Sequence, residues 1–131
     1  MIAVPNLLLV MIGGAIGCGC RYLVGALALR QLGSGYPFGT LIVNLLGGFL
    51  MGLLAGVLAR PQLLDLASDN LRLIVGVGML GGFTTFSAFS LETVDMLIRG
   101  QPTMAAAYAV CSVAGSVLML FAGLAATRAL A

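Results

Sequence analysis

The stretch GGFTTFSAFS, residues 81–90, places two adjacent glycines, four hydroxyl residues and three phenylalanines inside an otherwise apolar segment. No charged residue occurs between positions 73 and 91, a run close to the ~20 residues that a helix needs to cross a bilayer. Adjacent glycines weaken a helix, and backbone groups freed within a membrane must find other partners. The stretch therefore predicts a membrane-spanning helix that is broken near its middle.

The rest of the chain has the same apolar character. It is 61% hydrophobic and 8% charged over 131 residues, which is outside the range of soluble domains. Long uncharged runs separated by Gly, Pro and charged residues predict spans over residues 6–29, 39–59, 71–98 and 103–127. We therefore expect an all-α membrane protein with a single four-span domain over residues 1–131.

The few charged residues argue against several function classes. The six cationic residues are scattered arginines without a basic cluster, so no nucleic-acid partner is expected. There is no histidine, which disfavours a zinc site, and the three cysteines are expected to pack as small apolar residues inside the bundle. Glu92 and Asp95 lack an accompanying nucleophile or base, so the chain is not expected to be an enzyme. Their alternative roles are an interfacial cap or a partner for Arg99.

The arginines give little orientation bias. One side of the membrane receives Arg60, Arg72 and Arg128, the other receives Arg30 and Arg99, and Arg21 lies near the end of the first span. The positive-inside rule requires an excess on one side. Two interpretations stay open: the balance is accidental, or copies insert both ways and pair as an antiparallel dual-topology homodimer.

Small residues recur at helical spacing. Gly48, Gly52 and Gly56 repeat every four positions in the second span, and the first span carries Gly13 and Gly17. Such spacing lets helices approach closely in lipid. It is compatible with pairing of two copies and equally with packing inside one protomer.

A broken helix also frees main-chain carbonyls. The hydroxyls of Thr84, Thr85 and Ser87 can satisfy part of the freed backbone. Carbonyl oxygens that stay unpaired suit a hard monovalent cation, above all where two breaks face each other. We therefore predict a buried sodium ion at the break, held by main-chain carbonyls.

The side chains beyond the glycines form two stripes if the helix is continuous. One stripe is aromatic, the other carries hydroxyls, and each repeats every three residues: Phe83, Phe86 and Phe89, then Thr84, Ser87 and Ser90. Phenyl rings have a positive edge that can face a small anion. Core packing is the alternative role for the rings.

Other polar residues can face the same path. Asn44 is the only asparagine deep in a span, and Tyr108, Ser112 and Ser116 share one face of the fourth span. They are either interhelical hydrogen bonds or a line of neutral donors. Neutral donors suit an anion that must be dehydrated and released again, and Arg21 can concentrate anions near one mouth.

Three segments together resemble the Fluc/CrcB family of fluoride channels: GGAIGCGCRY at residues 13–22, GTLIVNLLGGFLMG at 39–52 and GMLGGFTTFSAFSLE at 78–92. The resemblance covers essentially the whole chain. It implies a fluoride-specific channel of bacterial inner membranes that allows passive efflux and protects against fluoride toxicity. It also implies an antiparallel dual-topology homodimer in lipid, with two pores and a central structural sodium ion.

The resemblance assigns roles to individual residues. It places in the fluoride pathway the ring pair Phe86 and Phe89, the pore asparagine Asn44, the polar track Tyr108, Ser112 and Ser116, the acid Glu92 and the vestibule arginine Arg21. We add Ser87 to this pathway from the hydroxyl stripe beside the rings. The carbonyls of Gly81 and Thr84 hold the sodium ion. Phe83 stands where relatives commonly carry Leu and is expected to pack. Ala88 replaces a hydroxyl residue of many relatives, so no hydroxyl contribution is expected there.

Two other functions are compatible with four short spans. A small dual-topology multidrug transporter requires a carboxylate embedded in the membrane, and the first span has none. A non-transporting assembly subunit accounts for the small residues. It leaves Asn44, Phe86 and Phe89 without a shared purpose.

Overall fold

The computed structural model describes residues 3–60 and 66–129. The described residues form helices and short connections, with no strand among them. In chain order the elements are α1 (Val4–Leu32), α2 (Phe38–Leu58), α3 (Leu66–Leu71), the π-helix η2 (Arg72–Leu80), α4 (Gly81–Phe83), α5 (Phe86–Ile98) and α6 (Pro102–Ala129). Four stretches are long and apolar enough to cross a membrane: Val4–Leu32, Phe38–Leu58, Asp69–Ile98 and Pro102–Ala129. The predicted all-helical, four-span architecture is confirmed.

The helix ends follow the local sequence. A proline occupies the first turn of α1, where its missing N–H breaks no helical bond. Gly33 ends α1 with φ of 80°, and its N–H donates to the Leu29 carbonyl at 3.0 Å. Gly100 turns the chain between α5 and α6 with φ of 72°. Glycine occupies both positions because a side chain strains this left-handed backbone.

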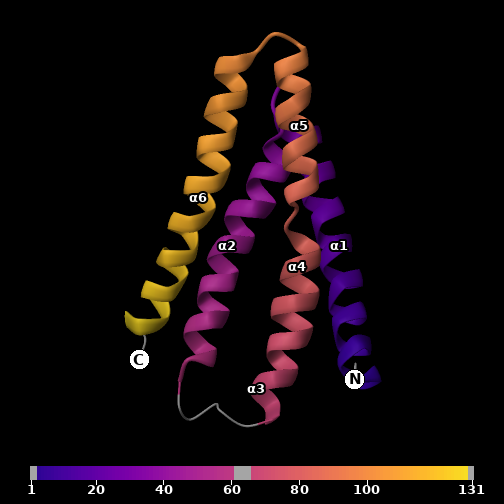
Figure 1. Ribbon diagram of the computed structural model, residues 1–131, viewed down its shortest axis with the longest axis vertical. Helices are drawn as coiled ribbons and strands as arrows, with labels where there is room; N and C mark the ends of the chain where they lie inside the picture. Colours follow the sequence, from indigo (N-terminus) through magenta and orange to yellow (C-terminus); the bar gives the residue numbers. More distant parts are fainter. Residues whose placement is uncertain (1–2, 61–65, 130–131) are drawn as a thin grey trace.

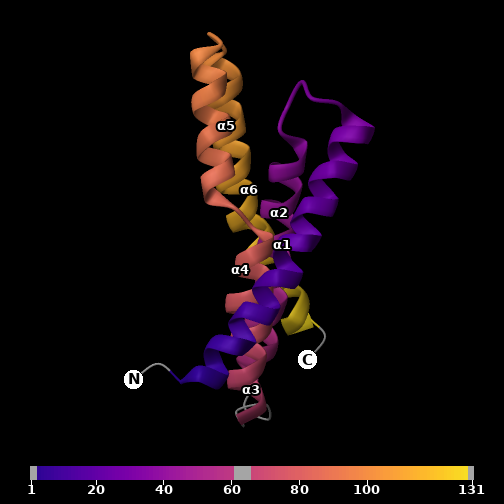
Figure 2. The same ribbon diagram turned by 90° about the vertical axis from the view of Figure 1, so that its right-hand side faces the viewer.

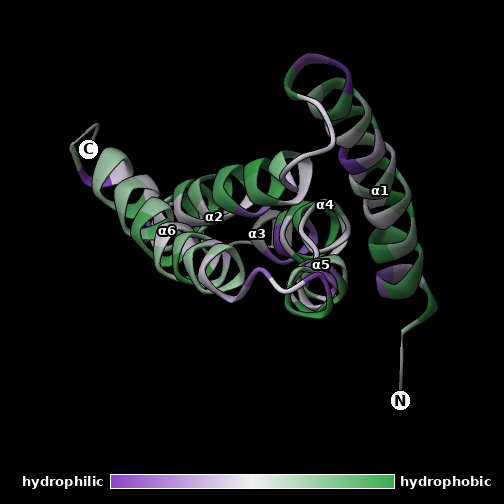
Figure 3. Cartoon of the chain, turned by 90° about the horizontal axis from the view of Figure 1, so that it is seen from above, coloured by the Kyte–Doolittle hydropathy of each residue, from purple (hydrophilic) through white to green (hydrophobic). Residues whose placement is uncertain are grey.

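The helices form two packed pairs joined through the third span. Helix α1 begins and α6 ends at the same end of the bundle (Figure 1). Helix α2 packs along α6, and α1 packs along η2. Figure 3 shows α1 on one side, α2 and α6 on the other, and α4 and α5 between them. At the opposite end, α5 and the start of α6 lean away from the end of α1 and the start of α2 (Figure 2).

Glycines make both helix pairs close. A Cβ atom on Gly52 would lie 2.1 Å from the Leu120 carbonyl oxygen, and one on Gly48 would lie 2.6 Å from that of Ser116. On the other pair, a Cβ on Gly13 would lie 2.1 Å from the Ile74 carbonyl oxygen. The regularly spaced glycines are therefore used for packing inside one chain, so they give no support to pairing of two copies.

The third span differs from the prediction in where its helix stops. Gly81 is helical, with φ of −63° and ψ of −37°. Gly82 is also helical, and a Cβ there would lie 2.7 Å from the Gly14 carbonyl oxygen. The extended residues come later: Thr84 has φ of −79° and ψ of 161°, and Thr85 has φ of −152° and ψ of 120°. The expectation that the glycine pair breaks the helix was wrong, because Gly82 is needed for close contact with α1.

The cysteines do not pack inside the bundle. Cys18, Cys20 and Cys111 are all exposed. The expectation of interior packing was wrong for the single chain, because their helix faces point away from neighbouring helices.

We predict that Gly17→Ala destabilises the fold, because its Cβ would lie 2.0 Å from the Met79 carbonyl oxygen. The expected loss is about 1–3 kcal/mol, the usual cost of overpacking. The matched control is Gly19→Ala in the same helix, where a Cβ meets nothing within 4 Å. The measurement is the unfolding midpoint in detergent. Equal midpoints for the two variants would contradict the glycine-mediated contact of α1 with the third span.

Candidate functional site

The two extended residues of the third span are held by one side chain. Asn44 Nδ2 donates to the Thr85 carbonyl at 3.0 Å, and the Thr85 N–H donates to Asn44 Oδ1 at 2.8 Å. Thr85 Oγ1 in turn accepts from the Ala88 N–H at 3.2 Å and so caps α5. Asn44 therefore satisfies both main-chain groups of an extended residue, as a neighbouring strand would.

These contacts leave two main-chain carbonyls without their helical donors. In an uninterrupted helix the N–H of Thr85 would donate to Gly81, and that of Ala88 would donate to Thr84. Both donors are diverted, the first to Asn44 and the second to Thr85 Oγ1. Within the single chain the Thr84 carbonyl accepts from Arg21 Nη1 at 3.2 Å. The two carbonyls predicted to hold sodium are thus among the main-chain oxygens at the break that lose their helical donors.

A groove of about 430 Å³ lies beside the break, between α2, α5 and α6. We call it the break groove. It brings together five residues of the predicted pathway: Asn44, Phe86, Phe89, Ser112 and Ser116. Thr84 and Thr85 also line it, and none of the described lining residues is charged. The groove is therefore a neutral cavity with amide, hydroxyl and aromatic groups in its wall.

The two rings of the groove are adjacent and differ in exposure. Their centroids are 5.4 Å apart, with an angle of 45° between the ring planes. Phe86 is 75% exposed, whereas Phe89 is 9% exposed. Phe83 is separated from them by the extended residues and is buried in the bundle, as expected for packing. The aromatic stripe is therefore not continuous, because the spacing of three applies only to an unbroken helix.

The hydroxyl stripe is interrupted in the same way. Thr84 Oγ1 donates to the Leu80 carbonyl at 3.0 Å, and Ser90 Oγ donates to the Phe86 carbonyl at 2.9 Å. Ser87 Oγ lies 3.3 Å from Thr85 Oγ1. Each hydroxyl has a local partner, and the three do not form one line.

Ser112 has an unusual environment. Its side chain is 4% exposed, and its hydroxyl has no hydrogen-bond partner among the described residues. Leaving a buried hydroxyl unpaired costs roughly 1–3 kcal/mol. Because Ser112 lines the break groove, its free donor and acceptor capacity is available to a small polar occupant.

Glu92 is joined to two helices. One carboxylate oxygen accepts from Thr40 Oγ1 at 2.7 Å, and the other accepts from the Tyr108 hydroxyl at 2.6 Å. Tyr108 is fully buried, and its ring centroid is 5.3 Å from that of Phe89. Tyr108 therefore connects the ring pair to Glu92, but it does not line the break groove.

The remaining pathway residues lie in a second cavity, of about 460 Å³, which we call the Arg21 cavity. Arg21 and Ser87 line it, together with Thr40 and Thr85. The structure thus separates Arg21 and Ser87 from the ring pair, and Thr85 lines both cavities.

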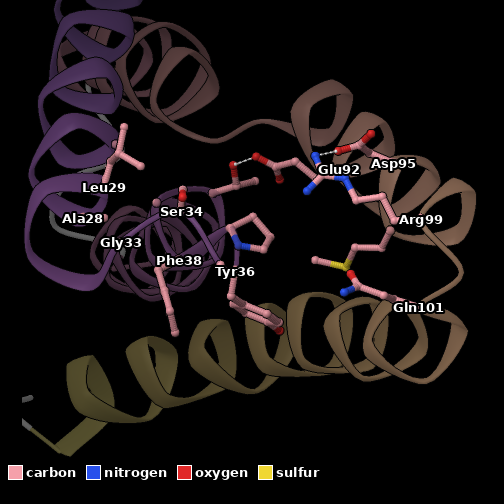
Figure 4. A pocket seen from close by; sticks show the side chains of 16 residues that line it. Ala28, Leu29, Gly33, Ser34, Tyr36, Phe38, Glu92, Asp95, Arg99 and Gln101 are labelled. Atoms are coloured by element: carbon pink, nitrogen blue, oxygen red, sulfur yellow. Dashed lines mark hydrogen bonds and ion pairs between the residues drawn. The ribbon is translucent and has the colours of Figure 1, made fainter.

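A third cavity, of about 340 Å³, is lined by residues of both the α1–α2 and the α5–α6 connections. This mouth cavity contains Glu92, Asp95 and Arg99 in its wall (Figure 4). Asp95 pairs with Arg99 one helical turn away, as the sequence suggested. Glu92 is not a partner of Arg99, because its oxygens bond to Thr40 and Tyr108.

Two residues at these sites were not predicted as site residues: Thr40 donates to Glu92, and Tyr36 packs edge-on against Tyr108 with centroids 5.5 Å apart. Thr85 caps α5, which is the backbone role expected of its hydroxyl. Burial raises the pKa of the Tyr36 hydroxyl, which keeps it neutral. The spacing of four between Thr40 and Asn44 was the available signal, since it places both on one face of α2.

Known proteins resemble this chain over nearly its whole length. The family described as CrcB-like protein, Camphor Resistance (CrcB), matches residues 8–124. A protein of Phenylobacterium zucineum (strain HLK1), named fluoride-specific ion channel FluC, is 55% identical over 93% of this chain and 94% of its own. Proteins with the same name from Chelativorans sp. (strain BNC1) and Mesorhizobium japonicum (strain LMG 29417 / CECT 9101 / MAFF 303099) are 52% and 47% identical, covering 91% and 95% of this chain and 93% and 98% of their own. Identity at this level across four apolar helices shows that the chain belongs to the CrcB family.

Proposed function

We propose that this protein is a fluoride-specific ion channel and not an enzyme. The observation that carries the proposal is the break groove, where two phenyl rings, an amide and a buried hydroxyl without a partner face one uncharged cavity. The relatives named as fluoride-specific ion channels support the choice of ion.

The groove chemistry suits a small anion that must enter and leave. A ring edge and neutral donors replace part of a hydration shell without a fixed charge that would retain the ion. Ser112 supplies an unused hydroxyl, and Phe86 presents a largely exposed ring. In acidified surroundings fluoride is protonated to neutral HF, which crosses the membrane. The HF then dissociates in the near-neutral cytoplasm and leaves fluoride inside the cell. The channel then allows passive efflux down the electrochemical gradient, which protects the cell against fluoride toxicity.

The channel is proposed to be an antiparallel homodimer in the inner membrane of a bacterium, with the broken third helix in mid-membrane. Phe86 lines the break groove and is 75% exposed, which supports a second copy that encloses the ring. The arginines divide almost evenly between the two ends of the bundle, which supports insertion in both orientations.

A structural sodium ion is proposed at the centre of the dimer, held by the carbonyls of Gly81 and Thr84. Diversion of their helical donors supports this placement. Arg21 and a cation exclude one another at the Thr84 carbonyl, because like charges repel, so the guanidinium must leave when sodium binds. The ion would join main-chain oxygens of two copies and stabilise the pair.

The multidrug-transporter alternative is disfavoured by α1. Its described residues include no carboxylate, and Arg21 there contacts the break. A cationic drug exchanged for protons requires an acid within the membrane.

We predict that the purified protein in liposomes releases fluoride and not chloride, measured with ion-selective electrodes and a potassium ionophore. Phe86→Ile should lower the fluoride rate roughly fivefold, since it removes a ring edge worth about 1 kcal/mol. The ring is 75% exposed, so the change should not affect folding of the protomer.

The matched control is Phe121→Ile. Phe121 is 63% exposed on α6 and lines none of the three described cavities. Its variant should conduct like the parent protein. Release of chloride at the fluoride rate, or sealed vesicles, would refute the channel. Equal rates for the two variants would show that the ring of Phe86 has no role in permeation.

For orientation, we expect identical reporters fused to the C-terminus to report from both sides of the bacterial membrane. An even arginine distribution gives the insertion machinery no preferred direction. The control is a variant with three lysines added at the C-terminus, which should shift the population to one side. A single population in the unaltered protein would contradict dual topology.

Sodium should raise the unfolding midpoint of the detergent-solubilised dimer relative to N-methylglucamine at equal ionic strength. A ligand that binds only the folded state stabilises it. Lithium and potassium serve as size controls. A midpoint independent of the cation would exclude a structural sodium ion.

A further inference from the structure

The three cavities described above share lining residues in series. The break groove and the Arg21 cavity share Thr85, and the Arg21 cavity and the mouth cavity share Gly25, Gly39 and Thr40. Polar side chains occur at both shared boundaries. A continuous set of cavity walls therefore runs from the helix break to the end of the bundle.

We propose that the mouth cavity is the aqueous end of the anion pathway and that Arg99 is the charge that allows an anion to enter it. This inference rests on the proposed channel function, and it assigns a role to a residue outside the predicted pathway. Arg99 sets the entry rate through the electrostatic potential of the mouth. It does not contact the ion at the rings.

The charges around the mouth cavity make Arg99 necessary. Its described lining residues include two acids, Glu92 and Asp95, and Arg99 is the one cationic side chain among them. Glu92 is held by hydrogen bonds from Thr40 and Tyr108 and cannot turn away. Without Arg99 two uncompensated carboxylates would face an approaching anion and lower its local concentration.

Arg99 is positioned by the end of α5. Its main-chain N–H donates to the Asp95 carbonyl at 3.0 Å, and its guanidinium pairs with the Asp95 side chain. A cation at a helix C-terminus is also favoured by the helix dipole. Figure 4 shows the pair next to Glu92, with Tyr36 and Gln101 below it in this view. The Arg99 and Asp95 side chains are 66% and 50% exposed, so salt can screen their effect on an ion in the mouth.

The test is the initial fluoride efflux rate from liposomes bearing Arg99→Gln, compared with Arg30→Gln. Arg30 lies in the last turn of α1, is exposed at the same end and does not line the mouth cavity. Both variants lose one positive charge. The assay is run at about 0.15 M ionic strength, where charges interact over about 8 Å, and at about 1 M, where the range falls to about 3 Å.

At the lower salt concentration Arg99→Gln should conduct about two- to fourfold more slowly than the parent, and the difference should vanish at the higher one. Arg30→Gln should match the parent at both. Arg99→Lys should restore the rate, because it keeps the charge. Asp95→Asn should raise the rate about twofold, and it tests the proposal independently if Arg99→Gln fails to fold.

The outcomes separate this inference from the proposed function. If the parent protein releases no fluoride, the proposed channel function is refuted. A parent that conducts, with Arg99→Gln and Arg30→Gln slowed equally or not at all at 0.15 M, overturns only the role of Arg99. If Arg99→Gln still lowers the fluoride efflux rate at 1 M, the role of Arg99 is also overturned, because salt at that concentration screens the attraction between an exposed charge and an anion.

Discussion

The pair of hydrogen bonds between the Asn44 amide and the main chain of Thr85 is the contact on which the site depends. Thr85 is extended between two helices, so its N–H has no helical acceptor, and its carbonyl begins α5 as the N-cap and gains a further donor from Asn44. In lipid each unpaired group costs several kcal/mol. Asn44 supplies one acceptor and one donor from the neighbouring helix. A residue without both groups would favour return of the segment to a continuous helix.

The break determines where the rings lie. Two extended residues change the direction in which the following helix presents its side chains, because a strand alternates sides whereas a helix advances 100° per residue. Phe83, before the break, packs inside the bundle, and Phe86 and Phe89, after it, line the break groove. The same interruption redirects the donors of the Gly81 and Thr84 carbonyls. Ring placement and carbonyl availability therefore share one cause.

Charged side chains line two of the three cavities described above and are absent from the described lining of the break groove. The break groove has no charged side chain among its described lining residues, whereas the Arg21 cavity has a guanidinium and the mouth cavity has two acids and Arg99. Exposed charges attract or repel ions over about one Debye length, whereas neutral groups bind an ion weakly enough to release it quickly. In the proposed channel, this division attracts an anion through the charged cavities and leaves the ring pair free of strong binding. Close glycine packing within the chain keeps the cavity walls in place.

Hydropathy and run length were sufficient to predict four spanning helices, because a bilayer requires apolar runs of a defined length. The rarity of buried amides in lipid was sufficient to single out Asn44, and the spacing of four in the fourth span grouped Ser112 with Ser116. Those inferences depend only on local periodicity, which the chain carries in its own order. The glycine repeats were ambiguous, since close approach looks the same whether the neighbour is the same chain or another.

Contacts between distant segments could not be predicted in this way. Periodicity assumes an unbroken helix, so it misplaced the break at Gly81 and Gly82 and grouped Phe83 with the groove rings. It also could not show that Asn44 meets Thr85, that Thr40 meets Glu92, or that Arg21 and Ser87 lie in a different cavity from Phe89. These pairings join residues about 40 to 65 positions apart, and they arise only when the helices pack, because the tilt and rotation of each helix are set by its neighbours.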